Sequence, residues 1–150
     1  MNATASSRKP AGMEIGQTKR VLIVDDDTAV LRLMRETLQN LLHYEVDTSP
    51  KPEYGFELAL KKEYDLMIFD FSMPLIDGTM LFLLISKAYE HATPPRRIPP
   101  LLLVSGQGSS ERAQELLKEA RVRGFLAKPF AINRLVEKVK GCFPTMESVS

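Results

Sequence analysis

The sequence predicts an α/β fold, in which a doubly wound, five-stranded parallel sheet is covered by five helices. Short runs of aliphatic residues alternate along the chain with segments of helical periodicity, and the connections between them are short. The length of 150 residues suits a single domain. Strands that are joined through helices run parallel, because each crossover returns the chain to the same end of the sheet.

The first half of the chain supplies two strands and two helices. Val21–Val24 is an aliphatic run rich in β-branched residues, which predicts a strand buried on both faces. Thr28–Leu42 has apolar residues at helical spacing, with Asp27 placed to cap its N-terminus. Tyr44–Thr48 alternates weakly and predicts a strand near the sheet edge. Glu53–Lys62 predicts a short helix after a proline-containing break.

The second half repeats this alternation. By the same criteria it predicts three further strands, at Leu66–Phe69, Leu101–Val104 and Gly124–Ala127. It also predicts three helices, at Thr79–Tyr89, Ser109–Ala120 and Ile132–Val139. The first of these helices is apolar over much of its circumference. A segment with four prolines, Thr93–Pro100, predicts an extended connection.

The composition excludes several classes of protein. With 20 Lys and Arg against 19 Asp and Glu, the chain lacks the basic surface of a dedicated nucleic-acid-binding protein. The longest apolar run, Met80 to Ile85, has six residues and is too short to span a membrane. The first twenty residues lack the apolar core of a secretory signal, and one cysteine cannot form an internal disulfide. We therefore expect a cytoplasmic protein with no nucleic-acid or membrane partner.

Polar side chains follow four of the predicted strands. These strands end on Asp25 and Asp26, on Asp70, on Ser105 and on Lys128. In an open parallel sheet, ligands bind beyond the carboxyl ends of the strands, near the point where the strand order reverses. If the first and third strands are neighbours, as in the order 2-1-3-4-5, the three aspartates lie close together.

This combination of side chains predicts phosphoryl transfer to a carboxylate. Three close carboxylates need a cation, and an oxygen-only ligand set suits Mg²⁺. Lys128 supplies a positive charge for a phosphoryl group, and Ser105 supplies a hydroxyl donor. Asp70 is our choice of nucleophile because a turn follows it, whereas Asp25 and Asp26 suit metal coordination as a pair. The geometry alone leaves that choice open.

Four sequence elements together resemble the receiver domain of two-component response regulators. They are Val24-Asp25-Asp26, Phe69-Asp70-Phe71-Ser72-Met73-Pro74-Leu75-Ile76-Asp77-Gly78, Val104-Ser105-Gly106 and Ala127-Lys128-Pro129-Phe130. Each occurs at a predicted strand end, and the four occur in the family's order. The resemblance implies a flavodoxin-like fold and divides the chain into a flexible leader (1–20), a receiver domain (21–143) and a C-terminal tail (144–150).

The resemblance also implies how the site works. Asp70 would accept a phosphoryl group from the phosphohistidine of a histidine kinase or phosphotransfer protein. Asp25, Asp26 and Asp70 would bind Mg²⁺ together with the backbone carbonyl of Ser72. Lys128 would contact the phosphoryl group, and the peptide bond that follows this lysine would be cis.

The resemblance assigns the conformational switch to Ser105 and Phe125. Ser105 would contact the phosphoryl group, and as it moves inward the ring of Phe125 would change rotamer. Tyrosine is common at position 125 in the family, so this chain lacks a hydroxyl there. The change would reach a surface for a downstream partner or for self-association, formed by the helix at 109–120, the strand at 124–127 and the helix at 132–139.

Other functions fit parts of the pattern. A phosphatase of the haloacid dehalogenase type also uses a strand-end aspartate and Mg²⁺, but it has a second aspartate two residues on, where this chain has Ser72. A pseudo-receiver that only binds partners is disfavoured because every expected site residue is present. We therefore expect a phosphoacceptor that dephosphorylates itself rather than an enzyme. We also expect a single-domain regulator without an output domain, although a receiver excised from a larger protein would have the same sequence.

Overall fold

The computed structural model describes residues 18–106 and 122–143, and its centre is a parallel sheet. The five strands are β1 (Arg20–Val24), β2 (Glu45–Ser49), β3 (Leu66–Asp70), β4 (Leu101–Ser105) and β5 (Val122–Ala127). Their order in the sheet is β2-β1-β3-β4-β5, and every neighbouring pair is parallel. This confirms the predicted fold class and strand order, including the place of β2 at the edge.

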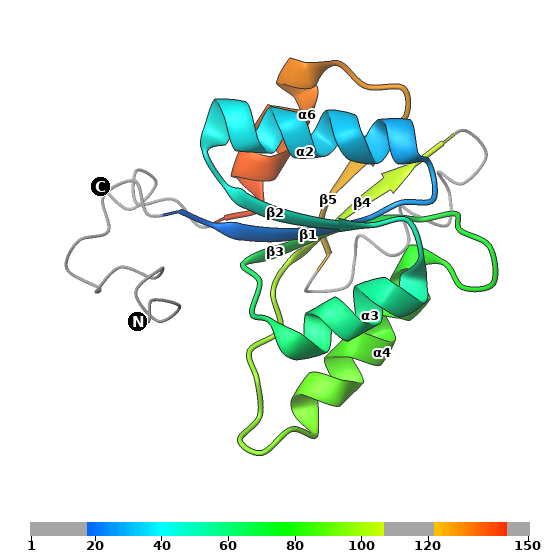
Figure 1. Cartoon of the computed structure of the whole chain (residues 1–150), viewed down its shortest axis with the longest axis vertical. Helices are drawn as coiled ribbons and strands as arrows, with labels where there is room; N and C mark the ends of the chain where they lie inside the picture. The colour runs from blue at the N-terminus through cyan, green and yellow to red at the C-terminus, as the bar shows by residue number, and fades with distance from the viewer. Residues whose placement is uncertain (1–17, 107–121, 144–150) are drawn as a thin grey trace.

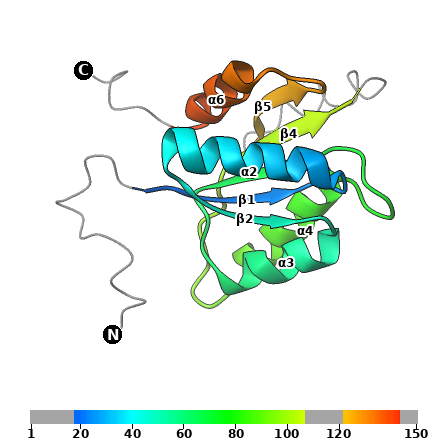
Figure 2. The same ribbon diagram turned by 45° about the horizontal axis from the view of Figure 1, so that its top comes forward.

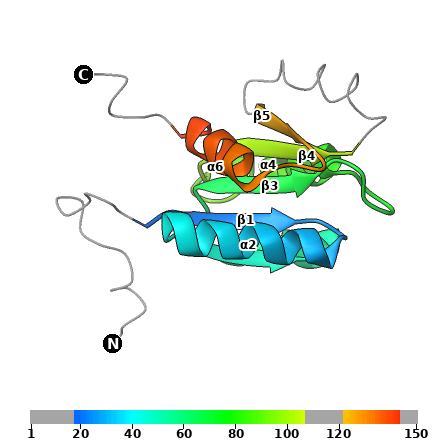
Figure 3. The ribbon, with the colours of Figure 1, turned by 90° about the horizontal axis from the view of Figure 1, so that it is seen from above.

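Helices cover both faces of the sheet. They are α2 (Thr28–Leu42), α3 (Pro52–Lys61), α4 (Gly78–Glu90) and α6 (Ile132–Gly141). α2 and α6 lie side by side on one face, and α3 and α4 lie on the other (Figures 1, 2 and 3). The helix predicted at 109–120 lies outside the described residues, as do the predicted leader up to residue 17 and the tail from residue 144. Within the described ranges, no helix is long and apolar enough to cross a membrane.

The sheet divides the hydrophobic core into two clusters. Successive residues of a strand point to opposite faces, so Val21 and Ile23 pack with α2 and α6, whereas Leu22 and Val24 pack with α3 and α4. All four side chains are fully buried. Burial on both faces explains why these strands are uninterrupted aliphatic runs rather than alternating ones.

Two aspartates begin the helices that follow the site strands. The side chain of Asp27 accepts hydrogen bonds from the backbone N–H groups of Ala29 and Val30, which confirms the predicted N-cap of α2. Asp77 caps α4 in the same way by accepting from the backbone N–H of Met80 at 2.8 Å. Both helices therefore start directly beyond the carboxyl edge of the sheet.

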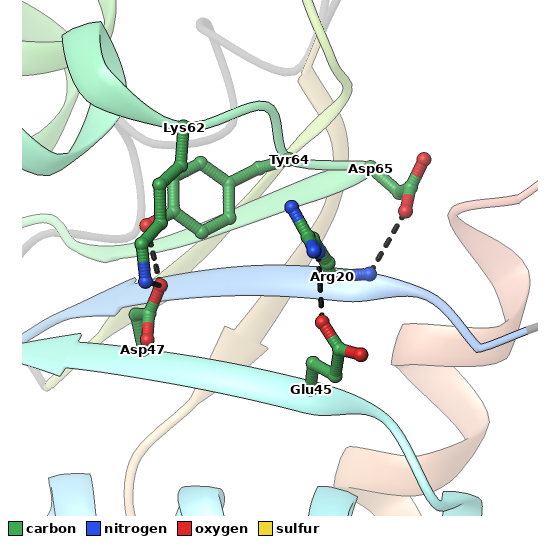
Figure 4. A network of polar contacts seen from close by, with 6 residues as sticks. All are labelled: Arg20, Glu45, Asp47, Lys62, Tyr64 and Asp65. Atoms are coloured by element: carbon green, nitrogen blue, oxygen red, sulfur yellow. Dashed lines mark hydrogen bonds and ion pairs between the residues drawn. The ribbon is translucent and has the colours of Figure 1, made fainter. Parts of the chain in front are cut away.

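A polar network joins β1, β2 and the start of β3 on the side of the sheet where the strands begin, away from their carboxyl ends (Figure 4). Its members are Arg20, Glu45, Asp47, Lys62, Tyr64 and Asp65. The backbone N–H of Arg20 donates to Asp65 at 2.8 Å, and its guanidinium donates to Glu45 at 2.7 Å. Asp47 accepts hydrogen bonds from the Tyr64 hydroxyl at 2.7 Å and from the Lys62 ammonium at 3.1 Å. These contacts tie β2 and the start of β3 to β1, which lies between them.

The proline-rich connection between α4 and β4 has no helix or strand, as predicted. Arg96 holds it against the domain. Its guanidinium lies 3.9 Å from the centre of the Tyr89 ring and donates to the backbone carbonyls of Leu60 and Lys62 at 3.1 and 2.8 Å. The end of α3, the end of α4 and this connection are therefore held together by one side chain.

Candidate functional site

The sheet brings the predicted acidic residues together at its carboxyl edge. Asp25 directly follows β1 and Asp70 is the last residue of β3, and these strands are paired with Val24 opposite Phe69. Asp25 and Asp70 are buried, whereas Asp26 is exposed. One carboxylate oxygen from each of the three lies within 4.8 Å of the others. The structure thus brings together the three acids that the sequence singled out.

Lys128 reaches this acidic cluster from β5, the outermost strand on the other side of β3. It directly follows β5, and its ammonium lies 2.9 Å from Asp25 Oδ2 and 3.4 Å from Asp70 Oδ1. Its backbone N–H donates to the carbonyl of Ser105 at 2.8 Å, which extends the pairing of β4 with β5 up to the site. The Lys128–Pro129 peptide bond is cis, as predicted.

Burial and charge perturb the ionisation of these groups. Burial raises the pKa of Asp25. Burial, followed by the nearby charge of Asp25, raises the pKa of Asp70 to about 6. Burial alone would lower the pKa of Lys128, but its contacts with Asp25 and Asp70 raise that pKa overall. One ammonium therefore faces two buried carboxylates, and the cluster favours a further positive charge.

The donor set fits a hard divalent cation. Carboxylate oxygens are the side-chain ligands that Mg²⁺ prefers, and Asp25, Asp26 and Asp70 offer one each at short mutual distances. The exposed Asp26 leaves an open side on which waters or a phosphoryl oxygen can complete the shell. Ser72 lies two residues beyond Asp70 in the connection from β3 to α4, and the role of its backbone carbonyl as a ligand stays a prediction.

The two predicted switch residues face the same side of the sheet. Ser105 is the buried last residue of β4 and pairs with Ala127, and Phe125 lies two residues earlier in β5. Because side chains two residues apart share a face, Phe125 lies diagonally from Ser105. Its ring is half-buried against the core cluster of α3 and α4. In this conformation the Ser105 hydroxyl donates to the backbone carbonyl of Gly106 at 3.3 Å.

Two features of the site were not predicted from the sequence. The backbone N–H of Asp27 donates to Asp25 Oδ1 at 2.9 Å, so the residue predicted only as a helix cap also fixes the buried carboxylate. Gly78 packs directly on the backbone of Asp70, where a Cβ would lie 2.4 Å from the carbonyl oxygen. In the sequence, the run of three aspartates could have indicated the hydrogen bond between Asp27 and Asp25. The glycine at the start of α4 could have indicated the close packing on the Asp70 backbone.

Comparison with known proteins gives a consistent result. Residues 21–140 match the protein family described as the response regulator receiver domain. The probable chemotaxis protein CheY of Rhizobium etli is 24% identical over 135 residues, which cover 90% of this chain and 100% of that protein. The transcriptional regulatory protein RprY of Bacteroides fragilis is 30% identical over 135 residues, which cover 85% of this chain and 50% of that protein.

Solved structures agree with the observed topology. The chemotaxis protein CheY4 of Vibrio cholerae is 25% identical with a TM-score of 0.71, and the match covers 84% of this chain and 99% of that one. A CheY-like receiver domain protein of Methanospirillum hungatei is 29% identical with a TM-score of 0.68, over 83% of this chain and 92% of that one. The chain spans half the length of the Bacteroides regulator but the full length of the Rhizobium protein.

Proposed function

The chain belongs to the response regulator receiver domain family, and on this premise we propose that it is a signalling module switched by phosphorylation of Asp70. The observation that carries the proposal is the cluster of three carboxylates with Lys128 at one edge of the sheet. Asp70 is the carboxylate at the end of β3, the central strand of the sheet. The phosphoryl donor is the phosphohistidine of a histidine kinase or phosphotransfer protein.

In the proposed reaction, a carboxylate oxygen of Asp70 attacks the phosphorus of the donor. The phosphorus–nitrogen bond breaks as the phosphorus–oxygen bond forms, and the imidazole leaves. Mg²⁺, when bound by Asp25, Asp26 and Asp70, supplies charge neutralisation for the transferring phosphoryl group. Lys128 moves its ammonium from the Asp25 carboxylate to a phosphoryl oxygen. Hydrolysis of the resulting acyl phosphate by water returns Asp70 to its starting state.

The signal is proposed to leave the site through Ser105 and Phe125. A phosphoryl group on Asp70 adds negative charge and acceptor oxygens, which attract the Ser105 hydroxyl. The movement of Ser105 vacates space on the face that Phe125 shares, and the half-buried ring fills it. β5 and α6 are the described part of the surface that changes, which we assign to a downstream protein partner.

We propose that the protein works in the cytoplasm, as is typical of the family. Self-catalysed dephosphorylation, without turnover of a separate substrate, distinguishes it from a phosphatase. Incubation with a phosphate ester and Mg²⁺ should release no more phosphate than a protein-free blank.

Phosphorylation by acetyl phosphate tests the proposal directly. Incubation with acetyl phosphate and Mg²⁺ should add one phosphoryl group, detected by intact mass, and Asp70→Asn should abolish the adduct. The matched control is Glu57→Gln, which removes an exposed carboxylate on α3 and should leave the adduct unchanged. An adduct that persists in Asp70→Asn would assign the nucleophile to another residue.

A further inference from the structure

The outward face of α4 is apolar where a surface helix is normally polar. Met80, Leu83 and Leu84 are 52%, 55% and 49% exposed. They recur at spacings of three and four residues and so share one side of the helix. The opposite side, with Leu81, Ile85 and other residues, is buried in the core. Among residues 18–106 and 122–143, the outward stripe is therefore not part of the fold's own packing.

Exposed apolar side chains are concentrated at this helix. Among the described residues, nine large hydrophobic side chains are exposed, and four of them belong to α4 or to the connection before it: Leu75, Met80, Leu83 and Leu84. Isolated exposed leucines are ordinary on soluble proteins, but a contiguous apolar stripe marks an interaction surface. We call Asp77, Met80, Leu83, Leu84 and Lys87 the α4 stripe.

The ends of the α4 stripe carry opposite charges. Asp77, the N-cap, lies at one end, and Lys87, in the last turn, lies at the other. Positions 77, 80, 84 and 87 are separated by three, four and three residues, so the charged and the apolar side chains lie on one line. Among the described residues, neither charged side chain forms an ion pair with another side chain within 4 Å, and Lys87 is exposed.

This arrangement is complementary to itself. Asp77 and Lys87 are each five residues from position 82, and Met80 and Leu84 are each two residues from it. Two copies of α4 that meet through this outward side and cross antiparallel at the level of position 82 place Asp77 of each opposite Lys87 of the other, and Met80 opposite Leu84. Because the contact has two-fold symmetry, each of these residue pairs occurs twice in the interface. A parallel contact would instead oppose like charges.

We propose that the α4 stripe is a self-association surface that binds a second copy of this chain in the antiparallel register. The charge pairs select the partner and its direction, and the apolar pairs supply the burial. A stripe of three apolar side chains per copy is small beside the roughly 800 Å² per partner of a stable complex. The dimer is therefore weak and reversible, with a dissociation constant of roughly 100 μM.

Sedimentation velocity of the full chain over about 10 μM to 1 mM tests the surface. The average mass should rise toward that of a dimer across this range, and Leu84→Glu should weaken association at least about tenfold. The matched control is Leu41→Glu on α2, where the leucine is 57% exposed and outside the stripe. A wild-type chain that stays monomeric at 1 mM, or an equal effect of Leu41→Glu, would overturn the proposal.

The register has its own test. Lys87→Glu places two carboxylates opposite each other in both pairs and should weaken association about threefold or more, less so at high salt. Leu83 lies one residue from the crossing point, so the two copies of Leu83→Cys should form an intermolecular disulfide at least about tenfold faster than Leu41→Cys. The native Cys142 is buried and does not compete. Equal cross-linking rates would rule out this register.

Discussion

Lys128 lies closer to Asp25 than to the proposed phosphoacceptor Asp70. Its ammonium is 2.9 Å from a carboxylate oxygen of Asp25 and 3.4 Å from one of Asp70. In the described part of the chain, this ammonium lies within 4 Å of both buried carboxylates and compensates their charge. The lysine is thus a structural counter-ion before phosphorylation and a phosphoryl ligand in the proposed function. A substitution of Lys128 should therefore change both the stability of the unphosphorylated protein and its phosphorylation.

Replacing Lys128 by Gln should destabilise the protein and make its stability depend on Mg²⁺. Without the ammonium, Asp25 and Asp70 are buried and uncompensated, which should lower the free energy of unfolding by about 1–3 kcal/mol. Millimolar Mg²⁺ should restore much of that loss by binding the same oxygens. Urea unfolding with and without Mg²⁺ measures both effects. Lys51→Gln is the control and should show neither effect, because this exposed lysine at the N-cap position of α3 makes no side-chain capping bond.

The pH dependence of stability should reveal the buried Asp70 carboxyl. Its pKa is about 6 in the folded chain, against 3.8 for the unperturbed group. Between these values the folded state binds more protons than the unfolded state, so the contribution of Asp70 to stability falls as pH rises from about 4 to about 6. Above pH 6, Asp70→Asn should therefore be more stable than the parent by up to about 2–3 kcal/mol without Mg²⁺.

Urea midpoints of the parent and of Asp70→Asn, measured without Mg²⁺ from pH 4.5 to 7.5, check this expectation. The difference between the two should grow with pH and then level off. Saturating Mg²⁺ should reduce it, because the metal stabilises the ionised carboxylate. A difference that does not change with pH would mean that Asp70 ionises like an ordinary surface aspartate.

Adding a methyl group at Gly78 should damage the proposed phosphoacceptor site. A Cβ there would lie 2.4 Å from the carbonyl oxygen of Asp70, and neither backbone can yield without moving the other. Gly78→Ala should cost about 2 kcal/mol of stability and slow phosphorylation by acetyl phosphate about tenfold. Gly141→Ala at the end of α6 is the control, since no atom lies within 4 Å of the added Cβ. Equal effects of the two substitutions would contradict the packing argument.

Replacing Ser105 by Ala should leave phosphorylation of Asp70 possible but weaken the conformational response of Phe125. The hydroxyl is proposed to respond to the phosphoryl group, and Phe125 is proposed to respond to the hydroxyl. The Ser105→Ala variant should still be phosphorylated, but the chemical shifts of Phe125 and of its neighbours in β5 should change less than in the parent. The comparison is made by NMR before and after phosphorylation. Equal shift changes in both proteins would mean that the signal travels by another route.

Much of this fold was predictable from the sequence because its strands are buried on both faces. Val21–Val24 and Leu66–Phe69 have no polar residue, and each expected strand differs from the observed one by a single residue. The start of β5 was placed two residues late, at Gly124 instead of Val122. The pairing of Leu101 with Val122 there depends on an irregular register that no local pattern records.

The site was predictable as a set of residues but not as a set of contacts. Topology alone brings Asp25 and Asp70 to one edge, because the strands before them are neighbours. The preference of Lys128 for Asp25 depends on the position of a long side chain between two acids, which strand order does not determine. Likewise, the four prolines before β4 predicted an extended connection but not the contact of Arg96 with Tyr89.

That contact has a consequence for how the domain opens. Arg96 uses its guanidinium to hold carbonyls at the end of α3 and the ring of Tyr89 in α4, so neither helix end can detach without releasing the proline-rich connection as well. The three segments therefore form a single unit of local unfolding. Their backbone amides should exchange with deuterium at a common rate, and the loss of one arginine side chain should raise that rate in all three segments, although they lie up to 36 residues apart in the sequence.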